Sequence, residues 1–390
     1  MLKRFRRSSL LRARTVIAWA AMTKQVFVLG AGFSKAASER VAEADRLPLL
    51  WELRPLVETW LRANKLPDPP FPADRFPMVG GTDVDVERWL SFLAQPPPWV
   101  GPADSKRCHA AFLDMSLAIA SVIRNQQQHV LDVPPVDWLP KLVEKWNGAQ
   151  PGCWEDPKDG DKLLPGAPEE KTTVITFNYD TLPERAYVHA APSGRGVPAT
   201  SAADLLVAPL MPVEARGLGI VTGRGFAGFQ LLKLHGSIDW YYSGAEASPD
   251  DTVFHNRFQT TWNGTDLLET RQYRNLIADK VPFLVPPTAV KTTAYRNATL
   301  RAQWAEAAVA LSSAEDLVLM GFSLPPTDSV VLDMIEMHFD RGRDVFVVDC
   351  SPDLPSKIDK LLPDRRVHGC YAGVADPIQQ WLNHDGLCRC

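Results

Sequence analysis

The sequence predicts an α/β protein built on a doubly wound, mostly parallel, Rossmann-like sheet. Short apolar runs rich in β-branched residues alternate with longer stretches of helical periodicity, which is the pattern of consecutive βαβ units. The first apolar run, Gln25–Leu29, leads directly into a glycine-rich turn at residues 30–34 and then into helix-forming residues. Four later runs also end in small or hydrogen-bonding residues, at the edge of the sheet where such folds bind their ligands.

Composition is that of a soluble globular protein, with either one large domain carrying insertions or two domains. The chain has 390 residues and a formal charge of −4, which gives no general reason to expect a nucleic-acid partner. Its six cysteines form no C-x-x-C pair, which argues against a zinc ribbon and a disulfide scaffold and is typical of a reducing, cytoplasmic compartment. No segment approaches the length of a membrane span, so we expect no membrane partner.

Residues 1–22 do not resemble the rest of the chain. Residues 1–14 are basic and contain no acid, and a short apolar run follows them. This resembles a signal or transit peptide, but the apolar run is short and no clear cleavage spacer separates it from the first strand. Because Met22 opens a natural beginning just before that strand, we expect residues 1–22 to be a disordered or misassigned tail.

We expect residues 23–390 to form one domain with three insertions. After the first βα unit, apolar residues recur at helical spacing, which predicts a helical insertion over about 54–146. A segment rich in Gly, Pro and Ala predicts an irregular insertion at about 186–228. A segment with many aromatic residues predicts a second irregular insertion at about 241–280.

The remaining elements alternate as a doubly wound sheet requires. We predict strands over residues 172–177, 229–234, 281–285, 316–320 and 344–348. We predict helices over residues 296–314, 327–341, 354–362 and 377–382. Since the carboxyl ends of parallel strands lie at one edge, the residues that follow these strands are expected to meet there.

The turns at this edge can bind a dinucleotide. Their backbone N–H groups and hydroxyls can donate to a pyrophosphate, and a carboxylate at a strand end can accept from a ribose diol. The expected binding residues are Gly30, Ala31, Gly32, Phe33, Ser34, Gly321, Ser323, Asp349 and Ser351.

The first turn is an imperfect match to the dinucleotide motif G-x-G-x-x-G. Gly30 is expected to take a positive φ, and Gly32 is expected to leave room for a pyrophosphate because it has no Cβ. Lys35 stands in place of the third glycine, and no acidic residue follows at the expected distance. A tight turn that binds no ligand is therefore the alternative.

Three further side chains can act on a bound ligand. Asn178 and Asp180 follow the strand at 172–177, and His235 follows the strand at 229–234. A carboxamide can hold a sugar hydroxyl or a water, and His235 is expected to be the general base because an unperturbed imidazole titrates near neutrality. The alternatives are an Asx turn for Asn178 and Asp180 and a purely structural role for His235.

The same edge carries four motifs in the order seen in sirtuin-like NAD-binding domains. They read Gly-Ala-Gly-Phe-Ser (30–34), Thr-Phe-Asn-Tyr-Asp (176–180), Lys-Leu-His-Gly-Ser (233–237) and Gly-Phe-Ser (321–323). The chain looks most like the bacterial branch linked to antiphage defence, whose members resemble sirtuins but hydrolyse NAD. The resemblance covers the sheet edge over about residues 24–350.

The resemblance implies that NAD is the substrate and that no metal is needed. By it, Gly30, Gly32 and Ser34 would bind the NAD phosphates, and His235 would be the catalytic histidine. The resemblance further implies that the nicotinamide ribose faces Asn178 and Asp180, and that the adenosine half is held by Gly321, Ser323 and Asp349.

Two features depart from the deacylating sirtuins. Their two C-x-x-C zinc pairs are absent, and where they carry Pro-Asp-Phe-Arg this chain reads Leu-Pro-Leu-Leu-Trp-Glu-Leu at residues 47–53. Without the zinc module, the groove for an acylated lysine has no evident scaffold. We therefore expect an NAD+ hydrolase that cleaves the nicotinamide–ribose bond, with His235 as base on a water or a ribose hydroxyl and Asn178 orienting it.

Two other functions stay open on the sequence. One is ADP-ribosyl transfer or deacylation at the same site, and the other is a non-catalytic module that senses NAD or ADP-ribose within a larger assembly. The long insertions suggest a homo-oligomer. A separately encoded ATPase or helicase, or a nucleic-acid-guided protein, is a further candidate partner.

Overall fold

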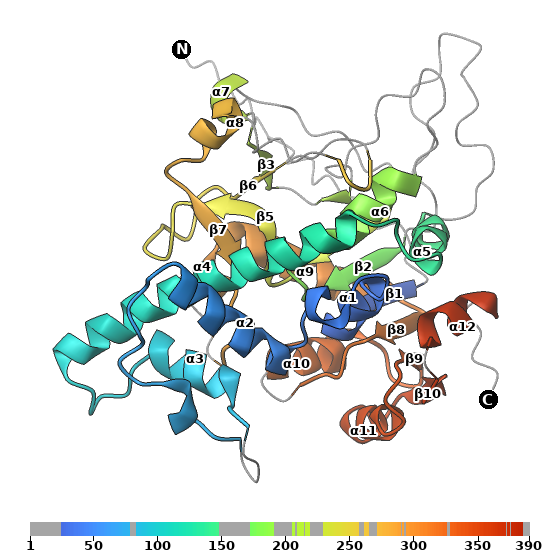
Figure 1. Cartoon of the computed structure of the whole chain (residues 1–390). Helices are drawn as coiled ribbons and strands as arrows, with labels where there is room; N and C mark the ends of the chain where they lie inside the picture. Colours follow the sequence, from blue (N-terminus) through green and yellow to red (C-terminus); the bar gives the residue numbers. More distant parts are fainter. Residues whose placement is uncertain are drawn as a thin grey trace, which may run out of the picture.

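The fold is seen in a computed structural model (Figure 1). It describes residues 25–78, 83–147, 172–190, 205–206, 209–213, 215–218, 229–256, 261–264, 271–289, 291, 294–325, 328–371, 373–374 and 376–384. The tail expected at residues 1–22 lies outside the described residues, as does most of the insertion expected at 186–228.

A parallel sheet forms the centre of the fold. Within the described residues it has six strands, in the order β10(Arg366–Cys370), β9(Asp344–Val348), β8(Asp316–Met320), β1(Gln25–Leu29), β2(Thr173–Thr176) and β4(Gln230–Lys233). Every neighbouring pair is parallel. Counted along the chain, this is the Rossmann order 3-2-1-4-5-6, so the prediction of a doubly wound sheet is confirmed.

The chain reverses its direction of winding between β1 and β8. From β1 it proceeds outward to β2 and β4, then returns to β8 on the other side of β1. Leu29 is paired with Thr176 of β2 and with Met320 of β8, so these three strands end level with one another. Ligands of doubly wound sheets bind outside the carboxyl ends of the strands at such a reversal.

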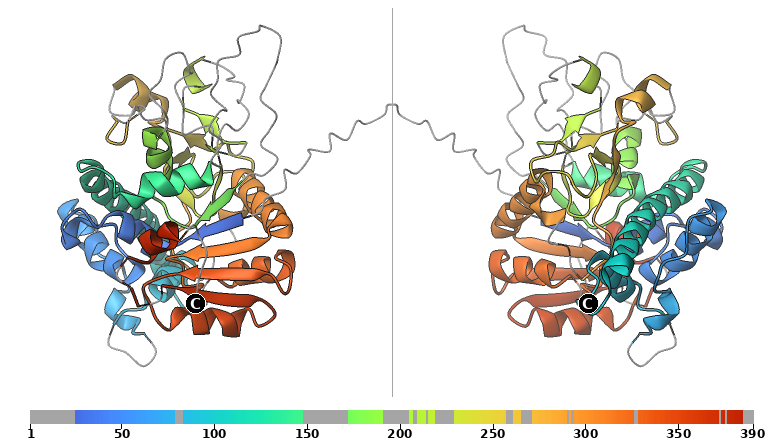
Figure 2. Two further views of the ribbon diagram at one scale, coloured as in Figure 1. Left: turned by 90° about the vertical axis from the view of Figure 1, so that its right-hand side faces the viewer. Right: turned by 90° about the vertical axis from the view of Figure 1, so that its left-hand side faces the viewer.

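Helices cover both faces of this sheet (Figure 2). One face packs against α1(Ala31–Ala37), α5(Trp138–Trp146), α6(Leu182–Ala190) and α12(Pro377–Asn383), and the other packs against α9(Ala298–Ser313), α10(Ser329–His338) and α11(Leu354–Leu361). Phe27 and Leu29 enter the first core, and Val26 and Val28 enter the second. This alternation is what a strand buried on both faces requires.

The stretch between α1 and β2 is helical, as expected for the insertion at about 54–146. It contains α2(Leu50–Ala63), α3(Val86–Ala94), α4(Pro102–Leu131) and α5. The 30-residue α4 runs from the left edge of the molecule past its centre in Figure 1 and packs against α2 and α3. In the part of the chain that the structure describes, no helix has both the length and the apolar character of a membrane span.

A second, smaller sheet lies beside the first. Its order is β3(Met211–Pro212), β6(Phe254–His255), β5(Gly236–Tyr242) and β7(Val281–Leu284), with β5 antiparallel to both β6 and β7. The segment expected to be irregular at about 241–280 is largely without helix or strand in its described part, which contains the end of β5, the two-residue β6 and α8(Arg271–Leu276). Nearly all of β5 is buried, so it lacks the polar–apolar alternation that identifies a half-exposed strand.

Two features at the C-terminal edge were also not predicted. The edge strand β10 reads Arg-Val-His-Gly-Cys, which has neither an apolar run nor a clear alternation. It is held by the parallel ladder with β9 and by α11. Cys370, the last residue of β10, is disulfide-bonded, a bond that the scattered cysteine spacing did not suggest.

A buried ion pair joins β4 to α6 beneath the sheet edge. Lys233 is fully buried, and its Nζ lies 3.0 Å from Glu184 Oε1 and also donates to the Asp180 carbonyl. Burial raises the pKa of the Glu184 carboxyl, and the Lys233 ammonium opposes that rise. The Lys233 ammonium therefore stabilises the ionised form of Glu184, which burial alone would disfavour.

We expect Lys233→Met to lower the free energy of unfolding by about 3–5 kcal/mol, because it leaves Glu184 buried without its cation. The double variant Lys233→Met/Glu184→Leu should recover a large part of that loss, since it removes both charges. Urea denaturation followed by tryptophan fluorescence measures both variants. If Lys233→Met is as stable as the parent, the pair does not stabilise the edge.

Candidate functional site

The turn after β1 packs directly on the turn after β8. Gly30 N donates to Met320 O at 3.1 Å, and Gly32 N donates to Gly321 O at 3.0 Å. Gly321 has a φ of +56°, and a Cβ at this position would lie 2.2 Å from Phe33 N. The two turns that flank the reversal of the sheet are thus in backbone-to-backbone contact.

This contact corrects the roles expected of two glycines. Gly30 has a φ of −111°, so it does not need the positive φ that the sequence suggested. A Cβ on Gly30 would lie 2.4 Å from Gly321 O, and one on Gly32 would lie 2.9 Å from Gly321 Cα. Both positions lack a side chain because the neighbouring turn fills the space, and both of their N–H groups already have acceptors.

Phe33 is also structural, which differs from its expected place among the binding residues. Its side chain is fully buried, and its ring lies 5.5 Å from the ring of Trp138 in an edge-on contact. Ala31, by contrast, is exposed on the outer side of the turn.

Asn178 connects the end of β2 to the first turn. Its Nδ2 donates to Gly30 O at 2.7 Å and to Ser34 Oγ at 2.8 Å. Ser34 Oγ in turn donates to Asp180 Oδ2 at 2.5 Å. The carboxamide is therefore fixed by its nitrogen, and its Oδ1 accepts no hydrogen bond from the described residues. That oxygen remains for a ligand hydroxyl or a water.

Asp180 serves the protein through both of its oxygens. Oδ1 accepts from Leu182 N at 3.1 Å, at the start of α6, while Oδ2 accepts from Ser34. The side chain is only 3% exposed. This is the Asx-turn arrangement that was the alternative for Asp180, and it positions Ser34 and, through Ser34, Asn178.

His235 reaches the same edge through two aromatic contacts. The His235 ring lies 5.0 Å from the Phe177 ring, and Phe177 stacks on Phe322 at 4.9 Å with an interplanar angle of 17°. Phe322 Cα would lie 2.7 Å from a Cβ on Gly30. His235 therefore does not touch the first turn, because the side chains of Phe177 and Phe322 lie between them.

A cluster of charged and phenolic groups surrounds the imidazole on its other side. His235 Nε2 lies 3.3 Å from Tyr295 Oη and 4.0 Å from Asp328 Oδ1. Asp328 is ion-paired with Lys291, and both side chains are buried. His235 Nδ1 makes no hydrogen bond to any described residue, and the side chain is buried.

The environment keeps His235 neutral. Burial, together with the positive charge of Lys291, lowers the pKa of His235 to about 3, and Asp328 acts in the opposite direction. The expectation of an imidazole that titrates near neutrality is therefore wrong. His235 can act as a neutral hydrogen-bonding group or a weak base at every physiological pH.

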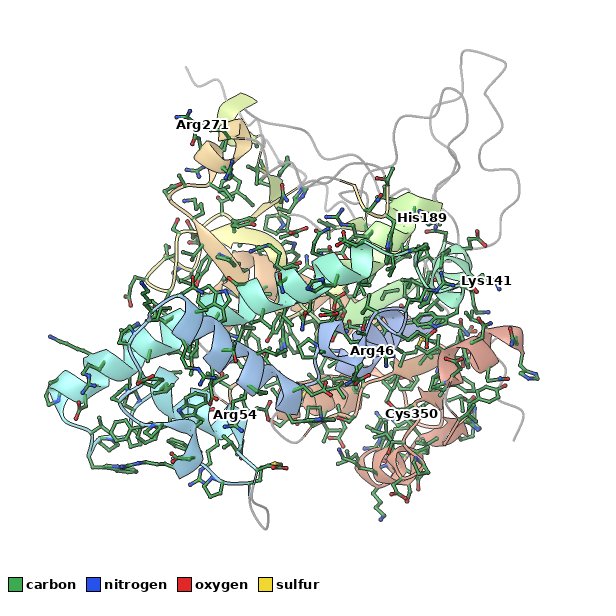
Figure 3. The ribbon with its side chains drawn as sticks, viewed as in Figure 1. Arg46, Arg54, Lys141, His189, Arg271 and Cys350 are labelled. Atoms are coloured by element: carbon green, nitrogen blue, oxygen red, sulfur yellow. The ribbon has the colours of Figure 1, made fainter. Side chains whose placement is uncertain are left out.

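The residues that follow β8 and β9 at this edge are more exposed to solvent than those that follow β2 and β4. Ser323 and Ser351 are exposed, while Asp349 is half-buried and accepts from Ser351 N at 2.8 Å. Burial raises the pKa of Asp349. The exposed Cys350, labelled in Figure 3, marks this end of β9. Gly321 N donates to Val348 O at 3.1 Å, so the β9 end adjoins the two packed turns.

Several residues of the cluster were not identified from the sequence. Lys291 and Tyr295 come from the segment between β7 and α9, and Asp328 precedes the first residue of α10. None of them directly follows a strand of the main sheet, which is where the sequence pattern indicates site residues. The motif around Asp328, Gly-Phe-Ser-Leu-Pro-Pro-Thr-Asp at 321–328, could have indicated it, since an aspartate before a helix is a recognised cap residue.

The described residues contain no group of three or more His, Cys, Asp or Glu side chains arranged to hold a metal ion. What the edge offers is a fixed carboxamide, a neutral imidazole, exposed hydroxyls and a partly buried carboxylate. These groups can orient a sugar and a water by hydrogen bonds.

Comparison with known proteins adds no relative. No protein-family model matches the chain, and no curated protein matches it. The sirtuin-like resemblance therefore remains a prediction from the four motifs.

Proposed function

We propose that the chain is an NAD+ glycohydrolase of the sirtuin-like type, which cleaves the bond between nicotinamide and ribose. The observation that carries the proposal is the hydrogen bond of Asn178 to Ser34 beside the packed turns of β1 and β8, with the His235 ring in contact with Phe177, the residue before Asn178. This is the reversal point of a Rossmann-ordered sheet, where dinucleotides bind in such folds. The order of the four motifs also supports it.

In the proposed reaction, water attacks the ribose carbon that is bonded to nicotinamide. Nicotinamide leaves with the electron pair of the glycosidic bond, and its ring becomes neutral. The water oxygen bonds to that carbon and its proton is released, giving ADP-ribose. Because the ribosyl carbon is strongly electron-deficient in the transition state, a weak base such as neutral His235 is sufficient. The Oδ1 of Asn178 orients the ribose hydroxyl or the water.

The pH dependence of this reaction follows from the lowered pKa of His235. Since His235 stays neutral down to about pH 3, protonation of this ring should not limit the rate between pH 5 and pH 8. We expect kcat/KM for NAD+ to vary by no more than about twofold over that range through this group. Stopped-time assays of nicotinamide release in a constant-ionic-strength buffer measure it. An acid limb near pH 6.5 that disappears in a His235 variant would contradict the proposed environment.

The wider role of the chain is also part of the proposal. We propose a function in bacterial antiphage defence, in the cytoplasm, as a homo-oligomer that can act with a separately encoded ATPase, helicase or nucleic-acid-guided protein. Trp51 and Trp99, which are 68% and 79% exposed, lie in the helical region and are candidates for subunit contact. Sedimentation of the purified chain, alone and as Trp51→Ser/Trp99→Ser, tests this contact: a change to a smaller species is expected.

A further inference from the structure

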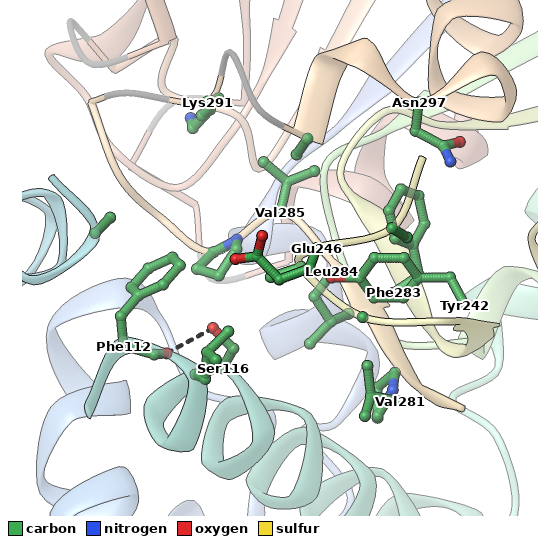
Figure 4. A pocket seen from close by; sticks show the side chains of 18 of the residues that line it. Phe112, Ser116, Tyr242, Glu246, Val281, Phe283, Leu284, Val285, Lys291 and Asn297 are labelled. Carbon is green, nitrogen blue, oxygen red and sulfur yellow. Dashed lines mark hydrogen bonds between the residues drawn. The ribbon is translucent and has the colours of Figure 1, made fainter. Parts of the chain in front are cut away.

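A large cavity lies beside the candidate site, on the other side of β7. Its volume is about 640 Å³, within the range of small-molecule sites. Figure 4 shows Phe112 and Ser116 of α4 on one side, and Lys291 and Asn297 on the opposite side. Val281 and Leu284 of β7 add apolar surface to its wall. The cavity is thus mainly apolar, with a few polar groups at one side.

Lys291 is a buried charged group of this wall that has unused hydrogen-bonding capacity. Its side chain is only 6% exposed, and an ammonium carries three N–H donors. Among the described residues its only partner is Asp328. Buried donors are normally satisfied, so the remaining N–H groups call for an acceptor from a ligand or from water.

A second cation stands at the same side of the cavity. Arg296 lines it, is exposed, and makes no ion pair with any described residue. The acidic group of the lining, Glu246, lies instead beside His109, with 3.6 Å between Oε1 and Nε2. Asn297 is already engaged, because its Oδ1 accepts from Thr299 N and its Nδ2 donates to Asp251 O. Two of the groups left for a ligand, Lys291 and Arg296, are therefore cationic.

We propose that this cavity is a second small-molecule site, for a compound with an apolar body and an anionic head group. The apolar body would lie against α4 and β7, and the head group would accept hydrogen bonds from Lys291 and Arg296. Because Lys291 is paired with Asp328, which lies 4.0 Å from His235 Nε2, the head group would compete with Asp328 for the ammonium. Val285 provides a second connection, since it lines the cavity and its N donates to His235 O at 2.9 Å.

Two fluorescent probes of the same shape test the site on the full chain. One is 8-anilinonaphthalene-1-sulfonate, and the other is N-phenyl-1-naphthylamine, which has the same aromatic body without the sulfonate. We expect the sulfonate to bind once per chain and about tenfold or more tighter than the neutral amine, because it adds charge-assisted hydrogen bonds. Equal affinities for the two probes would overturn the proposed recognition of an anion.

Variants locate the binding. Ser116→Trp fills the cavity from α4 and should abolish sulfonate binding, while Ala110→Trp, on the same helix but outside the cavity, should leave it unchanged. Arg296→Gln should weaken the sulfonate about tenfold and leave the neutral amine unaffected. Lys291→Met should also weaken sulfonate binding about tenfold without affecting the neutral amine. If Lys291→Met does not fold, because Asp328 is left buried without its cation, the double variant Lys291→Met/Asp328→Asn is measured instead. Unchanged sulfonate binding in Ser116→Trp would refute the site.

The effect on His235 rests on the proposed NAD cleavage and is measured separately. The sulfonate should change the rate of nicotinamide release in the parent and not in Ser116→Trp. If the sulfonate binds as expected but the rate does not change, the connection through Lys291 is refuted and the site stands. If the parent releases no nicotinamide at all, the proposed function fails while the binding result is unaffected.

Discussion

Replacing His235 by alanine is expected to lower the rate of nicotinamide release from NAD+ by at least about 100-fold. One ring nitrogen of the imidazole makes no hydrogen bond to a described residue, and the other lies 3.3 Å from Tyr295 Oη. Alanine removes the group that would hold or deprotonate the attacking oxygen. Chromatographic measurement of free nicotinamide, at equal concentrations of folded protein, gives the ratio of rates.

His255 offers a matched control for this substitution. It is also a histidine at 5% exposure, but it lies on β6 in the small sheet. His255→Ala should retain the rate of the parent to within a few-fold, provided that circular dichroism shows it folded. Asn178→Ala should lose activity as His235→Ala does, since it removes the carboxamide that is bonded to the first turn. Full activity in His235→Ala would refute the assignment.

Gly321→Ala is expected to disrupt the packed turns and to cost at least about 3 kcal/mol of unfolding free energy. Gly321 has a φ of +56°, and the new Cβ would lie 2.2 Å from Phe33 N and 2.5 Å from Gly32 C, both backbone atoms. The turn after β1 must move to make room. This turn contains Gly30, whose carbonyl accepts a hydrogen bond from Asn178 Nδ2, so the position of Asn178 should change as well. Loss of NAD+ cleavage should therefore accompany the loss of stability.

Gly342 provides a control that distinguishes the cost of a positive φ from the cost of the clash between the two turns. Gly342 has a φ of +74°, but an added Cβ meets no atom within 4 Å. Gly342→Ala should cost only about 1–2 kcal/mol, which is usual for alanine in a left-handed conformation, and should retain activity. Thermal denaturation of the two variants measures the difference. Equal destabilisation would mean that the contact between the turns adds nothing.

The central sheet could be predicted because its strands are buried on both faces. Continuous apolar runs such as those of β1 and β8 are typical of strands inside a parallel sheet, and each is followed by a turn. The edge strand β10 and the buried strand β5 lack this signal. The first is partly exposed, and the second is aromatic without alternation, so only their partners in the sheet identify them.

The site was predictable to the extent that it follows strand ends. Asn178 and His235 could be placed at one edge because parallel strands end together. The glycines at 30 and 32 have a packing role that the sequence did not indicate, since the neighbouring turn at Gly321 fills the space of a side chain. The pKa of His235 depends on burial and on Lys291, which is far from it along the chain, so local sequence carries no information about it.

The most direct test of the central claim is the product of NAD+ incubation in water enriched in oxygen-18. The proposed mechanism predicts equal amounts of free nicotinamide and of ADP-ribose that carries one heavy oxygen, with neither formed by His235→Ala. ADP-ribose attached to a protein would instead indicate transfer. NAD+ that binds at the edge and is recovered intact would contradict the proposed cleavage and would favour a sensing module.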